Sequence, residues 1–170
     1  MTRAVAFVLA LASSACAYGV APDVPPPAPP PAPAEDEPRG VTPTSIAIDP
    51  GADPTLAETT IAAVALWCRD TGGAYCPEVF VGYADRMRAD QWQVIDMDLA
   101  PYRASGGAWR GLRILALDPR YLQCVGIMAH ELGHAAGIDH ADDGVMRSAA
   151  PCYADAIDAH ALAEYFKHNP

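Results

Sequence analysis

Apolar and polar residues alternate in several short runs between Thr44 and Leu117, and this pattern predicts β-strands that bury one face. The clearest run, "TSIAIDP", ends in the turn "DPGADP". Three later runs, "EVFVGYA", "WQVIDMDL" and "GLRILAL", have a similar composition. The strands are expected at residues 44–50, 78–84, 92–99 and 111–117.

Apolar residues at helical spacing predict three helices. Asp53 caps and Pro54 opens the first, which runs to about residue 70, where two glycines follow. A second helix is expected to begin near Arg120, after the turn at "DP". A third is expected over residues 154–166, with an apolar face toward the core.

The order strand, helix, several strands, helix, loop and helix predicts an α/β or α+β sandwich. A chain of 170 residues accommodates one domain with its own core, which we expect over residues 41–170. Residues 17–40 precede it and contain the stretch "PDVPPPAPPPAPAEDEP". Proline removes backbone donors, so this stretch is expected to act as a semi-rigid linker, or to remain a disordered leader, rather than to build a core.

Residues 1–16 have the pattern of a secretion signal, since Arg3 precedes the apolar run "AVAFVLALA" and the small residues "SSAC". The apolar run is too short to span a membrane. Two kinds of processing remain open. In one, Cys16 is lipidated, as in bacterial lipoproteins, which we favour; in the other, Cys16 is discarded with the signal. Both predict export, either to the bacterial cell envelope through a lipid anchor or as a secreted protein.

Charge and cysteine content narrow the possible partners and compartment. The formal net charge of −10 argues against nucleic acid as a partner. Besides Cys16 there are four cysteines, an even number that suits disulfides in an oxidising compartment. Cys68 and Cys76 flank a loop with two glycines, and Cys124 and Cys152 flank the histidine-rich motif. We expect these two pairs to be bonded, the alternative being four free buried cysteines.

The segment "AHELGHAAGIDHADDGVM" holds three of the five histidines of the chain. His130 and His134 are four residues apart, so a helix places them on the same face, close enough to share a metal ion. Gly137 can end the helix in the left-handed conformation, and His140 can then return as a third ligand. Glu131 stands next to the first ligand. Three imidazoles leave one coordination position open, which is typical of catalytic rather than structural zinc.

The full pattern, H-E-x-x-H-x-x-G-x-x-H, resembles that of the metzincin zinc endopeptidases and is closest to the matrixin-like bacterial members. Met146, six residues after His140, matches the methionine turn beneath the zinc site of that clan. The resemblance implies a twisted mixed sheet packed on the active-site helix and a second helix, with a C-terminal helix after the turn. It also implies an edge strand at the cleft, for which residues 104–109 are the candidate. The sequence departs from the clan at Ala141, which matches none of its best-known subgroups.

The resemblance implies an enzyme that hydrolyses peptide bonds. It assigns one catalytic zinc to His130, His134 and His140, which lowers the pKa of a bound water, and it assigns Glu131 as general base. It implies a protein or peptide substrate lying extended along the edge strand, with residues 147–151 bordering the pocket for the residue after the cut. We expect a monomer, and the sequence identifies no calcium site.

The alternative function is a non-catalytic, zinc-stabilised surface lipoprotein that binds peptides. Glu131 argues against it, because a structural zinc site does not require that carboxylate. A zinc amidase acting on cell-wall material is also less favoured, because the spacing of the third ligand resembles that of an endopeptidase.

Overall fold

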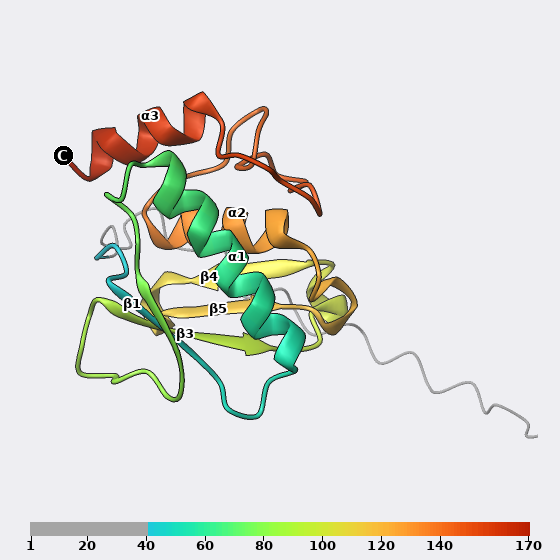
Figure 1. Ribbon diagram of the computed structural model, residues 1–170. Helices are drawn as coiled ribbons and strands as arrows, with labels where there is room; N and C mark the ends of the chain where they lie inside the picture. Colours follow the sequence, from blue (N-terminus) through green and yellow to red (C-terminus); the bar gives the residue numbers. More distant parts are fainter. Residues whose placement is uncertain (1–40) are drawn as a thin grey trace, which may run out of the picture.

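The computed structural model describes residues 41–170, so Cys16, the signal of residues 1–16 and the linker of residues 17–40 lie outside the described residues (Figure 1). Five strands form one sheet in the order β2-β1-β3-β5-β4. Their bounds are β1 Ser45–Ile48, β2 Glu78–Val81, β3 Gln91–Asp96, β4 Gly106–Trp109 and β5 Ile114–Leu117. β1 pairs in parallel with β2 and β3, and β3 with β5, whereas β4 is antiparallel to β5. With three helices, this mixed sheet makes an α+β fold.

β4 lies at one edge of the sheet and falls within the segment 104–109 expected to hold the edge strand. Gly106 pairs with Leu117 and Trp109 with Ile114, so β5 covers one side of the strand. The other side of β4 has no strand partner within residues 41–170. Backbone groups along such an edge are available to an added strand.

The first helix, α1 (Pro54–Asp70), has the bounds expected from the sequence, and the Asp53 carboxylate accepts the Thr55 N–H at 2.8 Å. The starts expected for the other two helices are wrong. α2 (Val125–Ala135) begins after residue 120, because Asp118 caps a separate 3₁₀ turn first. α3 (Ala159–His168) begins after residue 154, because Asp158 has extended backbone and caps the helix there.

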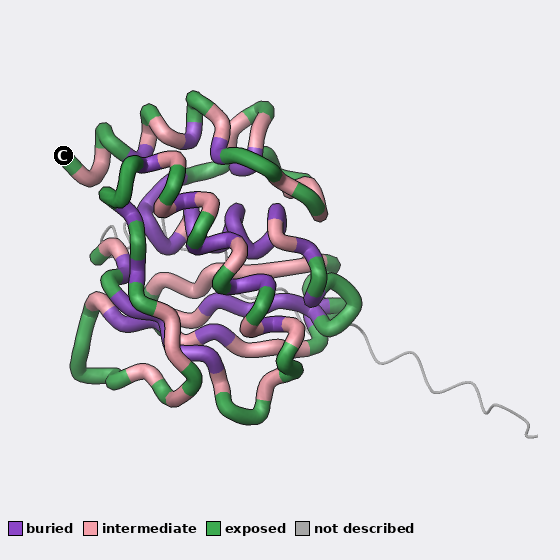
Figure 2. The backbone as a smooth tube through the Cα atoms, viewed as in Figure 1, coloured by how far each residue is buried: buried purple, intermediate pink, exposed green. Residues whose placement is uncertain are grey.

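One core joins α1 and α2 to the sheet, and the buried segments of Figure 2 run through the central strands and α2. Figure 1 shows α1 crossing the strands. Two buried side chains donate to α2 main-chain carbonyls: Trp67 Nε1 to Ala129 at 2.8 Å and the Tyr75 hydroxyl to Leu132 at 3.1 Å. The strands supply side chains at alternate positions, namely Ile46, Ile48, Trp92, Val94, Leu115 and Leu117. The helix that carries the histidine motif is therefore held by packing and by hydrogen bonds at fixed points.

Two disulfides are present, Cys68–Cys76 and Cys124–Cys152, the same pairs that the sequence analysis expects. The second spans 28 residues and links the residue before α2 to the segment after Met146. In the loop-entropy model a ring of this size stabilises the fold by about 3.6 kcal/mol. Disulfides suit an oxidising compartment. None of the helices within residues 41–170 has the length and apolar character needed to cross a membrane.

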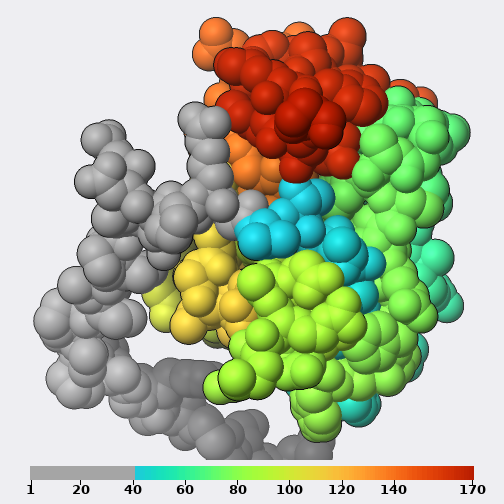
Figure 3. Space-filling view, turned by 90° about the vertical axis from the view of Figure 1, so that its left-hand side faces the viewer, coloured from blue at the N-terminus to red at the C-terminus, as the bar shows by residue number. Residues whose placement is uncertain are grey.

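The start of the described chain lies beside α3, as Figure 3 shows for the segment before β1. The Thr42 hydroxyl donates to the Asn169 side-chain carbonyl. A hollow of about 630 Å³ opens here, lined by residues 42–44, 73–77, 165–166 and 169–170. None of these residues belongs to the histidine motif.

Candidate metal centre

Three histidine side chains converge at the end of α2. His130 and His134 lie on successive turns of the helix, and Gly137, at φ +89°, reverses the chain so that His140 returns toward them. One ring nitrogen from each histidine lies within 4.8 Å of the other two, and the Nε2 atoms of His134 and His140 are 3.2 Å apart. This group could hold a metal ion. Imidazole suits zinc, copper, iron and nickel.

Main-chain carbonyls orient two of the rings. His130 Nδ1 lies 2.8 Å from the Val145 carbonyl, and His134 Nδ1 lies 2.8 Å from the Ile138 carbonyl. A carbonyl only accepts, so each Nδ1 carries the proton and each Nε2 keeps its lone pair for a metal. Carbonyls that fix the tautomer of a ligand histidine in this way usually raise metal affinity.

Burial favours the neutral form of both helix histidines. Desolvation lowers the pKa of His130, and the neighbouring His140 lowers it further. Desolvation, together with repulsion from His130, lowers the pKa of His134 to about 4. Since metals bind the neutral ring, burial favours the form of these two side chains that a metal ion would bind.

We expect Zn²⁺ to displace clearly fewer than three protons per site at about pH 5.5. Three imidazoles with an ordinary pKa near 6.5 would release about 2.7 protons at that pH. The pKa of about 4 for His134 removes nearly one of these, and the lowered pKa of His130 removes part of another. Titration calorimetry in buffers of different ionisation enthalpy measures the number. It should use the Glu131→Gln variant, so that this carboxyl contributes no proton. Release of nearly three protons would contradict the burial of the two rings.

Glu131 lies between α2 and the edge strand and is buried. An added Cβ at Gly106 of β4 would stand 2.7 Å from Glu131 Oε1, so the carboxylate lies directly against the strand backbone. Burial raises the pKa of Glu131 to about 8. The carboxylate therefore has a high affinity for a proton, and a nearby cation would favour its ionised form.

Met146 packs beneath the two ligand turns, where the methionine turn was expected. Its side chain is fully buried. A Cβ at Gly133 would lie 2.3 Å from Met146 Sδ, so glycine between the two helix ligands permits this contact. The methionine acts by packing under the helix.

Asp158, which the sequence analysis did not select, anchors the main chain at Val145, the residue whose carbonyl orients His130. Asp158 Oδ2 accepts the Val145 N–H at 2.8 Å, while its Oδ1 accepts the Ala161 N–H at 3.0 Å. Gly144, at φ +75°, gives the carboxylate room, since a Cβ there would stand 2.1 Å from Oδ2. An aspartate at the position just before a helix predicts a helix cap, but no local sequence pattern indicates the contact of Asp158 with Val145.

We expect Asp158→Ala to destabilise the fold by about 2 kcal/mol and to weaken metal binding about tenfold, because it removes a helix cap and releases the Val145 peptide. Urea unfolding and chelator competition measure the two effects. Asp53→Ala is the matched control, since Asp53 caps α1. The control should lose stability but keep metal affinity; an equal loss of metal affinity in both variants would show that Asp158 acts only as a cap.

The chain has two further histidines. His160 and His168 lie on α3. Arg110, which the sequence analysis did not select, contacts the carbonyls around the metal centre.

No known protein family matches this chain, and no curated protein is detectably similar to it in sequence.

Proposed function

We propose that this protein is an exported zinc endopeptidase of the metzincin type, similar to the matrixin-like bacterial members. The observation that carries the proposal is the convergence of three imidazoles beside a buried glutamate, at the unpaired edge of a sheet. A structural metal site would need neither the glutamate nor an open coordination position.

The donor set fits zinc. His130, His134 and His140 would hold the ion through ring nitrogens, which zinc commonly accepts in groups of three at catalytic sites. A bound zinc ion polarises a substrate carbonyl and lowers the pKa of a water molecule. The carbonyls of Val145 and Ile138 keep two of the rings in the required tautomer.

Glu131 is the group that moves the proton. Its carboxylate takes a proton from the attacking water and delivers it to the nitrogen of the departing amine, so the carboxylate is regenerated at the end of each cycle. Burial favours the protonated form of Glu131, whereas a bound cation would favour the carboxylate, so the side chain could both accept and release the proton. The close packing of Gly106 against Oε1 fixes the direction of the carboxylate.

The substrate is a protein or peptide bound in extended form. β4 offers a free edge directly beside Glu131, and main-chain pairing along such an edge holds a peptide with little regard to its sequence. Residues 147–151 would border the pocket for the residue after the cut. The Gly126 N–H donates to the Cys152 carbonyl at 3.0 Å, which fastens the end of this segment to α2.

The cellular setting belongs to the same proposal. The signal of residues 1–16 indicates export, and lipidation at Cys16 with the proline-rich linker would hold the domain off the cell envelope. The two disulfides are consistent with an oxidising environment outside the cytoplasm.

A peptide library analysed by mass spectrometry, with and without a zinc chelator, tests the proposed activity. We expect internal cleavages that stop with chelator and return with added Zn²⁺, together with about one zinc per chain and weakened zinc binding in His140→Ala. Zinc and peptide binding without any cleavage would favour the non-catalytic lipoprotein instead. Absence of zinc would contradict both functions.

A further inference from the structure

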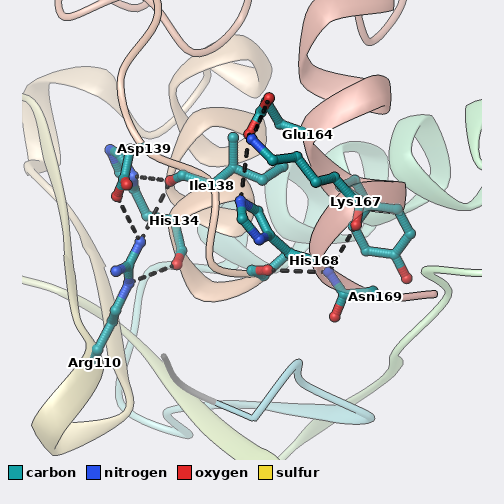
Figure 4. A network of polar contacts seen from close by, with 10 residues as sticks. Arg110, His134, Ile138, Asp139, Glu164, Lys167, His168 and Asn169 are labelled. Atoms are coloured by element: carbon teal, nitrogen blue, oxygen red, sulfur yellow. Dashed lines mark hydrogen bonds and ion pairs between the residues drawn. The ribbon is translucent and has the colours of Figure 1, made fainter. Parts of the chain in front are cut away.

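Arg110 follows β4 directly and reaches the C-terminal end of α2. Its Nε donates to the His134 carbonyl at 3.0 Å, and its Nη2 donates to the Ile138 carbonyl at 3.4 Å. The same Nη2 lies 3.3 Å from Asp139 Oδ1. Figure 4 shows the guanidinium facing these acceptors. The Arg110 side chain is 21% exposed and Asp139 is 89% exposed, so the two main-chain acceptors, rather than the ion pair, determine its position.

The carbonyls that Arg110 contacts are those that position metal ligands. The Ile138 carbonyl also accepts a hydrogen bond from His134 Nδ1, so the guanidinium and the His134 ring share one acceptor. The His134 carbonyl belongs to the last turn of α2, and Ile138 lies two residues before His140. A cation at this place also complements the negative end of the helix dipole.

The turn that follows α2, between His134 and His140, is held from its other side as well. Asn169 Nδ2 donates to the Ala136 carbonyl at 3.3 Å, and Glu164 pairs with Lys167 and His168 nearby on α3 (Figure 4). Arg110 therefore holds the turn after α2 from the side of the sheet, and Asn169 holds it from the side of α3. Of the two supports, only Arg110 reaches a carbonyl that orients a ligand ring.

We propose that Arg110 is a positioning residue that fixes the metal-ligand turn to the edge strand. Its planar fork of donors holds two carbonyls at once, and so sets the relative placement of β4, His134 and His140. The peptide-binding edge and the metal centre are then joined by one side chain. This inference rests on the metal site of the proposed function but does not require proteolysis.

Cobalt substitution in the full domain tests this role without relying on activity. We expect Arg110→Met to weaken Zn²⁺ binding in chelator competition by roughly 10- to 100-fold, the usual effect of losing a group that orients ligands. The visible absorption spectrum of bound Co²⁺ should change in shape, which loss of global stability alone would not cause. On a short peptide, kcat should fall more than KM rises.

Arg113→Met is the matched control. Arg113 ends the short 3₁₀ turn that begins at Arg110, and its Nη2 donates to the Arg86 carbonyl instead of to the metal-ligand turn. It should keep the affinity and the Co²⁺ spectrum of the unchanged protein. If Arg110→Met does not fold, Arg110→Lys decides, since a lysine cannot hold two carbonyls in the fork geometry and should lose about threefold or more in affinity.

Unchanged Zn²⁺ affinity and Co²⁺ spectrum in a folded Arg110→Met, or in Arg110→Lys if the first does not fold, would overturn the role of Arg110. Equal effects in Arg113→Met would overturn it too. An unchanged protein that binds Co²⁺ but cleaves no peptide would refute only the proposed protease, and one that binds neither Zn²⁺ nor Co²⁺ would refute both.

Discussion

Replacing Glu131 with Gln is expected to lower kcat for peptide hydrolysis by about 10³- to 10⁴-fold while the protein still folds and binds one zinc. The substitution keeps the size of the buried side chain and removes only its ability to accept a proton. Steady-state kinetics on a fluorogenic peptide measure kcat. Zinc analysis and thermal unfolding of the same samples show whether metal binding and stability are retained.

Glu58→Gln is the control, because Glu58 is exposed on α1 and away from the histidines. It should leave kcat, metal content and stability unchanged. If Glu131→Gln keeps its hydrolytic rate, the carboxylate is not the base, and if it loses zinc, the carboxylate serves the metal site instead.

Adding one methyl group at Gly106 is expected to cost about 10²-fold in kcat, the size of effect that follows a displacement of about 1 Å at a reacting group. The new Cβ would stand 2.7 Å from Glu131 Oε1 and 2.9 Å from Ile127 Cγ2, so the carboxylate must move. Zinc affinity should stay within a few-fold, because no ligand histidine is among the nearest contacts of the new methyl group. The same kinetic and metal assays apply.

Gly107→Ala is the matched control on the same strand, since its Cβ would meet the end of the Trp109 ring rather than Glu131. It should retain most of the activity. Combining Gly106→Ala with the shorter Glu131→Asp should give less than the product of the two single losses, because both act on one carboxylate. Full additivity, or a small effect of Gly106→Ala alone, would mean that the strand does not position the base.

Local signals in the sequence account for the parts of the fold that were expected correctly. α1 begins at Asp53 and Pro54, where a cap and a first-turn proline coincide, and Gly137 has the left-handed conformation needed to turn the chain. The strands were recognisable by alternation. β4 was not, since its two glycines have no apolar alternation, and only the family resemblance pointed to an edge strand there.

The helix starts and the supporting contacts could not be read from the sequence. The start expected for α3 at residue 154 overlooked Asp158, whose side chain serves both the helix and the Val145 amide. Arg110 reaches acceptors 24 and 28 residues away, and no local pattern indicates such a contact. The three histidines follow one local motif, whereas the groups that orient them come from other elements of the fold.

The Cys124–Cys152 disulfide affects how the protein withstands proteolysis. His130, His134, His140, Glu131 and Met146 all lie inside the 28-residue span that it closes. The exposed residues of this span, such as Asp142 and Asp143, are open to attack. A single cut there would leave both fragments joined through the disulfide. The molecule could thus be cut in this loop while the three histidines stay in one covalently linked unit, and they would separate only after a further cut or chemical reduction.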